Sequence, residues 1–170
     1  MCAGYVLSVQ PRLLPDLLVL SAPSLDDNQP GWQRPAARLL DGIMPRLRLP
    51  AGIPDGRSRD TAVDDAWAAD PLCSSTATVH WGAEAFREQD RLHALLAGLP
   101  AMPVPTLVFH GGEDPIVPVR ASERFRALAN VTIRINDGLY HEQHNEPGHP
   151  EVLAEVVTWI RTHAPFPAAV

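Results

Sequence analysis

The chain has 170 residues, of which 45% are hydrophobic, so it is long enough for one domain with a buried core and too short for two. It carries 20 acidic and 14 basic residues, for a formal net charge of -6, and every basic residue is an arginine. An acidic chain without a basic stripe argues against a nucleic-acid partner.

The cysteines and the first residues show no sign of export or membrane insertion. Cys2 and Cys73 have no CxxC or Cys/His spacing around them, which argues against a disulfide framework and a zinc knuckle. The opening residues 1–23 are apolar, but they lack a basic start and are interrupted by Arg12 and Asp16, so they predict neither a signal peptide nor a membrane span. We therefore expect a soluble, cytoplasmic protein.

Residues 1–23 are predicted to form a helix followed by a strand. The run LLVLSAP at 17–23 is apolar, too short for a buried helix, and ended by a proline. Such runs are typical of strands that are buried on both faces of a parallel sheet.

Residues 24–100 break this pattern with turn-rich segments. Two stretches, 35–47 and 81–100, look like short helices that carry large apolar side chains. The region is therefore predicted to be a helical insertion between the first strand and the second.

Residues 101–170 are predicted to alternate between strands and helices. Strands are expected at 105–114 and 131–137. Apolar residues recur at helical spacing over 118–130, and a last amphipathic helix is predicted over 149–165. This alternation indicates an α/β fold with helices layered on a parallel sheet.

Two reactive side chains each follow one of the predicted strands. Asp114 comes at the end of the run at 105–114, and His141 lies in the segment DGLYHEQHNEP after the next strand. Loops at the carboxyl ends of parallel strands assemble sites, so both side chains should face one crevice. A carboxylate that binds one imidazole nitrogen leaves the other free to take a proton from a hydroxyl nucleophile. The pair therefore predicts two members of a Ser-His-Asp triad.

A metal site is the competing interpretation of the same segment. The sequence from His141 to His144 is similar to the H-E-x-x-H zinc helix, but its two histidines are three residues apart, not four. A metal-dependent hydrolase would need His149 as a third ligand. On this spacing no metal or other cofactor is expected.

Five segments together resemble the monoacylglycerol lipase and lysophospholipase branch of the α/β-hydrolase fold, the serine aminopeptidase-like hydrolases. They are LLVLSAPSL, SRD followed by DPL, WGAEAFRE, PTLVFHGGEDPIVP and DGLYHEQHNEP. The resemblance implies a serine hydrolase of carboxylic esters of glycerol or glycerophospholipid, with Asp114 as triad acid and His141 as general base. Residues 24–100 would be a cap over the acyl pocket, which would also allow peripheral contact with lipid surfaces.

Large apolar side chains of this cap are the candidates for lining the acyl pocket. Under this interpretation Met44, Trp67, Trp81 and Phe86 contact substrate, with Trp32 as a further candidate. A small core inside the cap accounts for the same side chains, so both interpretations stay open.

The sequence departs from this family at the nucleophile. The fold places its serine in a G-x-S-x-G turn ahead of the strand at 17–23, and no G-x-S-x-G occurs in these 170 residues. The sequence is therefore expected to be the C-terminal portion of such a hydrolase, inactive by itself, with Met1 at the position after the serine. The alternative is a non-catalytic lipid-binding or partner module derived from the fold. Four other serines are candidates for the nucleophile, but none lies between glycines on a strand-to-helix turn: Ser21, Ser24, Ser74 and Ser75.

Overall fold

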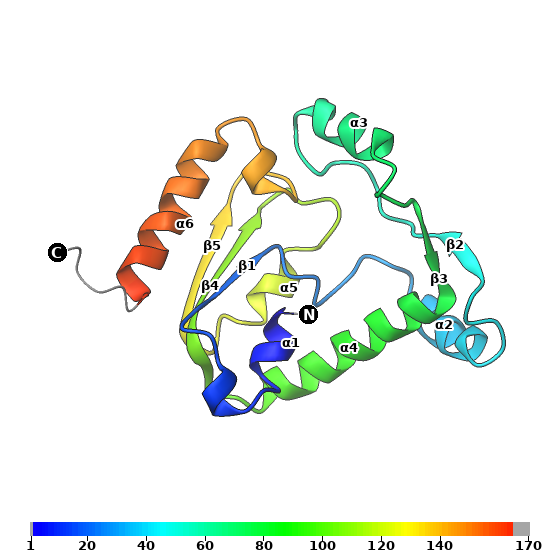
Figure 1. Ribbon diagram of the computed structural model, residues 1–170, viewed down its shortest axis with the longest axis horizontal. Coiled ribbons are helices and arrows are strands. Elements are labelled where there is room, and N and C mark those ends of the chain that lie inside the picture. The colour runs from blue at the N-terminus through cyan, green and yellow to red at the C-terminus, as the bar shows by residue number, and fades with distance from the viewer. Residues whose placement is uncertain (1, 165–170) are drawn as a thin grey trace.

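The computed structural model describes residues 2–164 and contains a parallel sheet with helices on both faces (Figure 1). A second, outlying part is built from residues that lie between the first and second strands of this sheet. The sheet has three strands in the order β1-β4-β5. Their bounds are β1 (Leu18–Ser21), β4 (Ala101–Gly111) and β5 (Ala129–Asn136).

Both strand pairs of the sheet are parallel. β1 and β4 pair from Leu18 opposite Thr106 to Ser21 opposite Phe109. β4 and β5 end together, with Gly111 opposite Asn136. The loops that leave the two strands therefore start at the same edge of the sheet.

Side chains alternate between the two faces of β4, as the pleat requires. Val104 and Val108 belong to a large buried cluster on one face, whereas Leu107 and Phe109 pack with Val152 on the other. Figure 1 shows α6 alone against the second face. The helices of the first face are α1 (Cys2–Val6), the end of α4 (Val79–Ala97) and α5 (Arg120–Glu123), and that of the second is α6 (His149–His163).

The helix predicted over 118–130 is much shorter in the structure. Only α5, Arg120–Glu123, is α-helical, and turns follow it up to β5. Phe125 and Leu128 are nevertheless buried, at 0% and 7% exposure. The apolar spacing thus marked residues that reach the core, although most of the segment forms turns and not a helix.

The insertion is not purely helical, which corrects the prediction for residues 24–100. A two-stranded antiparallel sheet joins β2 to β3, with Arg48 opposite Thr78. Each of its strands has three residues, too few for a periodic pattern to be visible in the sequence. The elements of this part are α2 (Gln33–Asp41), β2 (Arg48–Pro50), α3 (Thr61–Ala69), β3 (Thr76–Thr78) and the first turns of α4.

Helix α4 connects the insertion to the core. Its first turn is capped by Thr78, whose side chain accepts a hydrogen bond from the Trp81 N–H at 3.1 Å. Leu92 and Leu96, near its other end, are buried against the sheet. Two short 3-10 turns complete the fold, at Pro11–Leu13 and Gln143–Asn145. No helix in residues 2–164 is both long and apolar enough to cross a lipid bilayer.

Candidate active site

The structure brings the two predicted site residues together at the carboxyl edge of the sheet. Asp114 follows β4, and His141 follows β5, its neighbour in the sheet. His141 Nδ1 lies 2.7 Å from Asp114 Oδ2, a hydrogen-bond distance. The Asp114 side chain is fully buried, whereas 25% of the His141 side chain is exposed. One face of the imidazole can therefore be reached from outside.

Backbone donors fix the other oxygen of the Asp114 carboxylate. Oδ1 accepts hydrogen bonds from the N–H groups of Ile116 at 2.8 Å and Val117 at 2.9 Å. Burial raises the pKa of Asp114, but the interactions with His110, His141 and the Val117 N–H outweigh burial and hold that pKa well below its ordinary value. The carboxyl is therefore ionised at neutral pH.

His110, which is not among the predicted site residues, is a fully buried neighbour of Asp114. Its Nε2 lies 3.0 Å from the Val117 carbonyl oxygen, to which it is hydrogen bonded, and 3.0 Å from Asp114 Oδ2. Because both neighbours are acceptors, this nitrogen carries a proton. Nδ1 lies 2.6 Å from the Ser122 hydroxyl. A histidine at the end of a buried strand, four residues before the acid, is the signal that would have identified it.

Glycines allow the histidine loop to approach the end of β4. A Cβ on Gly111 would lie 2.1 Å from the Tyr140 carbonyl oxygen and 2.3 Å from that of Leu139. Gly138, which begins the loop, has a φ of 74°, in the left-handed region that favours glycine. These two residues let His141 reach Asp114.

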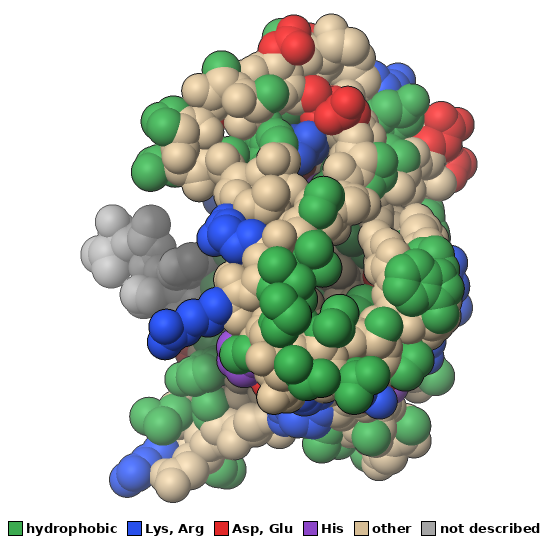
Figure 2. Space-filling model, turned by 90° about the vertical axis from the view of Figure 1, so that its right-hand side faces the viewer, with side chains coloured by type: hydrophobic (Ala, Val, Ile, Leu, Met, Phe, Trp, Pro, Cys, Tyr) green, Lys and Arg blue, Asp and Glu red, His purple; other side chains and the backbone are tan. Residues whose placement is uncertain are grey.

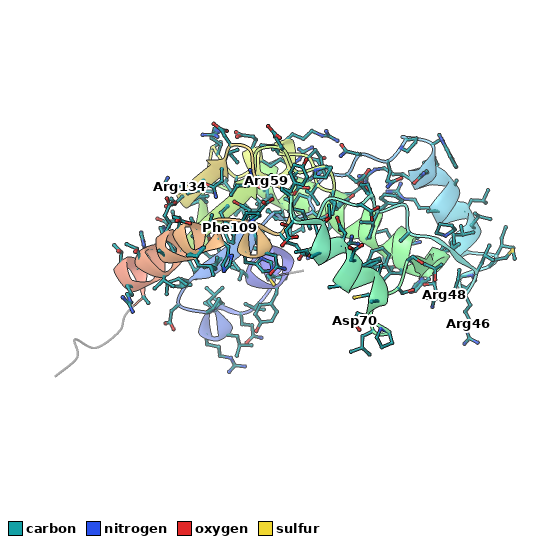
Figure 3. The ribbon with its side chains drawn as sticks, turned by 90° about the horizontal axis from the view of Figure 1, so that it is seen from above. Arg46, Arg48, Arg59, Asp70, Phe109 and Arg134 are labelled. Carbon is teal, nitrogen blue, oxygen red and sulfur yellow. The ribbon has the colours of Figure 1, made fainter. Side chains whose placement is uncertain are left out.

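A buried carboxylate, Glu146, holds the backbone next to the histidine. Its Oε1 accepts a hydrogen bond from the Tyr140 N–H at 2.7 Å, and its Oε2 accepts one from Arg59 Nε at 2.8 Å. Arg59 belongs to the insertion and lies where that part meets the body of the molecule, away from Arg46 at the far end (Figure 3). No pattern in the sequence indicates this role of Glu146.

The other histidines do not gather into a metal site. His144 is exposed, and His149 Nδ1 lies 3.1 Å from the Glu146 carbonyl oxygen. Within residues 2–164 the one cluster of three ligand side chains is in the insertion, at Asp41, His80 and Glu84. There Arg87 pairs with both carboxylates, so a cationic side chain already occupies the cluster.

An open, mainly apolar cavity of about 600 Å³ lies between the insertion and the loop that follows β4. Its lining includes Ile116, two residues beyond Asp114, and three of the side chains proposed for a pocket: Trp32, Trp81 and Phe86. The other two lie elsewhere: Met44 is 48% exposed, and the Trp67 ring stacks 3.8 Å from the Arg57 guanidinium. Figure 2, which shows the molecule from the side of α2, β2 and β3, has hydrophobic side chains gathered on that side.

A second hollow, of about 500 Å³, lies between α6 and the sheet. It is lined by Phe109 and Trp159, among others, and neither Asp114 nor His141 reaches it. The first cavity also lacks Asp114 and His141 in its lining, but it includes Pro115 and Ile116, the two residues that follow Asp114.

The candidate serines are not paired with the histidine. Ser21 is exposed at the end of β1, Ser24 lines the cavity, and Ser74 is bonded to Arg48 in the insertion. Among the described residues, His141 has no hydrogen-bonded serine hydroxyl. The structure thus contains an acid and a base in contact without a nucleophile bonded to them.

Known proteins match this chain over most of its length. The family model of serine aminopeptidase S33 matches residues 3–148. A monoacylglycerol lipase from Mycolicibacterium smegmatis is 34% identical over 150 residues, which cover 76% of this chain and 51% of the lipase.

Solved structures of other proteins share the fold of this chain. A monoacylglycerol lipase from Paleococcus ferrophilus superposes with a TM-score of 0.85 at 25% identity. The match covers 95% of this chain and 64% of the lipase chain. A soluble variant of the monoglyceride lipase from Saccharomyces cerevisiae superposes with a TM-score of 0.80 at 19% identity. The match covers 96% of this chain and 61% of the lipase chain. The chain thus spans between 51% and 64% of the length of these relatives. It belongs to the serine aminopeptidase S33 family of the α/β-hydrolases.

Proposed function

We propose that this chain supplies the acid and the base of a Ser-His-Asp triad in a carboxylic ester hydrolase of the monoacylglycerol lipase type. The observation that carries the proposal is the hydrogen bond between buried Asp114 and partly exposed His141. An ionised carboxylate that accepts the Nδ1 proton leaves a lone pair on Nε2, the nitrogen that acts as general base.

The chemistry follows from this arrangement and a serine outside these 170 residues. His141 Nε2 takes the serine proton as the oxygen attacks the ester carbonyl, and then gives that proton to the departing alcohol. A water molecule then attacks the acyl-serine ester, with His141 again acting first as base and then as acid, and the carboxylic acid product is released. Asp114 keeps the imidazole in the correct tautomer and stabilises the imidazolium in each half-reaction.

The apolar cavity supports a substrate with a long acyl chain. A volume of about 600 Å³ with a mainly apolar lining of aromatic and aliphatic side chains suits an alkyl chain. Because the cavity reaches Ile116, an acyl chain held in it would place its ester near the acid and base. We therefore assign the substrate to esters of the acylglycerol or lysophospholipid type.

The serine would be carried by a segment upstream of these 170 residues. Among the described strands, β1 pairs with β4 on one side only. A further parallel strand along the open edge of β1 would end at the same edge of the sheet as β4 and β5, and the turn after it would face His141. On this proposal the 170-residue chain does not turn over esters by itself.

The test is to express the 170-residue chain and the reading frame extended upstream, and to assay both with p-nitrophenyl esters. We expect only the extended form to be active, and His141→Ala and Asp114→Asn to lower its kcat by about 10³ to 10⁴. His144→Ala, in the same loop but exposed, is the matched control and should retain activity.

Other outcomes separate the alternatives. Activity of the short chain that His141→Ala abolishes would contradict the absence of a nucleophile and make Ser24, in the cavity lining, the next residue to replace. If both forms bind long-chain esters without hydrolysing them, the chain is a non-catalytic lipid-binding module instead.

A further inference from the structure

A three-residue segment of the insertion clamps the loop that carries His141. The Ser58 hydroxyl donates to the Asn145 carbonyl oxygen at 3.0 Å, and the Arg57 carbonyl oxygen accepts from the Glu142 N–H at 2.6 Å. Both contacts are made by residues that closely follow His141 in the sequence. They join residues that are more than 80 positions apart in the chain.

The strongest part of this clamp is the Glu146 carboxylate. Its side chain is fully buried, and it accepts from Arg59 twice: from Nε at 2.8 Å and from the backbone N–H at 3.3 Å. The same carboxylate accepts from the Tyr140 N–H, the amide immediately before His141. A buried carboxylate needs such donors, because an unpaired charge in the interior is strongly unfavourable.

We propose that Arg59 and Glu146 are positioning residues that set the place of His141 relative to Asp114. Arg59 fixes the Glu146 carboxylate, and Glu146 fixes the backbone at Tyr140, so the histidine is held from the insertion. The inference rests on the proposed function for its catalytic consequence. Its structural consequence, that the hydrogen bond from His141 to Asp114 depends on Arg59, does not require any turnover.

The first measurement uses the 170-residue chain and proton NMR. The His141 Nδ1–H, hydrogen bonded to a carboxylate, gives a downfield signal, identified by its loss in His141→Ala. We expect this signal to weaken or disappear in Arg59→Ala and in Glu146→Gln while the rest of the spectrum stays dispersed. Arg59→Lys keeps the charge but not the guanidinium geometry and should give an intermediate result.

The matched control is the ion pair between Arg124 and Asp26, which forms no hydrogen bond with the loop that carries His141. Its arginine has the same kind of exposure, 41% against 43% for Arg59, and it binds the carboxylate at 2.6 and 2.9 Å. Arg124→Ala should leave the downfield signal unchanged. If Arg59→Ala and Arg124→Ala weaken the downfield signal equally, the effect is a general one on folding and the proposal is overturned. The proposal is also overturned if neither variant weakens the signal.

The second measurement is kinetic and uses the extended reading frame. Arg59→Ala should lower kcat by about tenfold to a hundredfold, since small displacements of a catalytic group have effects of this size, with KM changed less than about twofold. A change confined to KM would overturn the positioning role. If the extended form has no activity but the NMR signal behaves as expected, the proposed function fails and the positioning of His141 stands.

Discussion

At the scale of single residues, the candidate site is organised around one carboxylate. Asp114 is fully buried, yet two backbone N–H groups hold one of its oxygens and the His110 and His141 rings face the other. Such a set of donors favours the ionised form more than burial disfavours it, which is why the pKa of Asp114 is lowered. A negative charge held in a fixed orientation is what a triad acid requires.

This lowered pKa predicts how acid affects stability. As pH falls below about 4, the unfolded chain protonates Asp114 before the folded chain does, so this residue stabilises the fold at neutral pH and loses that contribution in acid. The contribution of Asp114 to the free energy of unfolding should fall by about 1.4 kcal/mol for each pH unit below about pH 4, until the folded chain also takes up the proton. Asp114→Asn should therefore be less stable than the unmodified chain at pH 7, with a difference that narrows toward pH 3.

Urea unfolding of the two proteins at a series of pH values measures the effect. Other carboxyls with lowered pKa, such as those of Asp26 and Asp64, titrate in both proteins and cancel in the difference. A difference in unfolding free energy that stays constant from pH 7 to pH 3 would contradict the assignment.

At the scale of secondary-structure elements, the site depends on how closely the ends of β4 and β5 approach. The two strands are in register up to Gly111 and Asn136, and the loop after β5 then folds back over the end of β4. Backbone carbonyl groups of that loop fill the space where a side chain on Gly111 would lie. The approach thus depends on the absence of a Cβ at this position.

We expect Gly111→Ala to lower the free energy of unfolding by at least about 2 kcal/mol, because the atoms it meets are backbone and cannot rotate away. Gly82→Ala is the control: it lies in α4, and a Cβ there would meet no atom within 4 Å. That change should be neutral or should stabilise the chain by about 0.5 to 1 kcal/mol through helix propensity. Urea unfolding measures both, and equal effects would refute the explanation.

At the scale of the whole molecule, the insertion encloses the cavity and also holds the histidine loop. Helix α4 links the two parts, with one end beside α2 and the other packed under the sheet (Figure 1). Small side chains of α4 that face the cavity, such as Ala85, leave space that a larger side chain would fill. The cavity volume is therefore a property of how the insertion packs on the body.

Ala85→Leu should weaken the binding of a long-chain fluorescent fatty acid by about tenfold. The added carbons displace roughly two methylenes of the ligand, each contributing about 0.8 kcal/mol, and this sum corresponds to a factor of about ten. Ala94→Leu, on an exposed position of the same helix, is the control and should bind normally. Fluorescence titration measures both, and unchanged binding by Ala85→Leu would place the acyl site elsewhere.

The sequence by itself determined the α/β class, the three strands of the main sheet and the pair formed by Asp114 and His141. These features follow from local patterns: buried parallel strands are continuous apolar runs, and residues just beyond the ends of neighbouring strands meet at one edge. The assignment of pocket residues was less secure, since Trp67 contacts Arg57 and not the cavity. Hydrophobicity favours the burial of a side chain, but it does not identify the residues that the side chain will contact.

Only the tertiary structure decided the features that depend on distant parts of the chain. The antiparallel pair of β2 and β3 joins segments too short to show a period, and Arg59 meets Glu146 from 87 positions away. His110 matters because the folded chain brings Ser122 to one of its ring nitrogens and Asp114 to the other. The physical reason is the same in each case: hydrogen bonds and ion pairs act through space, whereas periodicity in a sequence reports only which face of a local element is apolar.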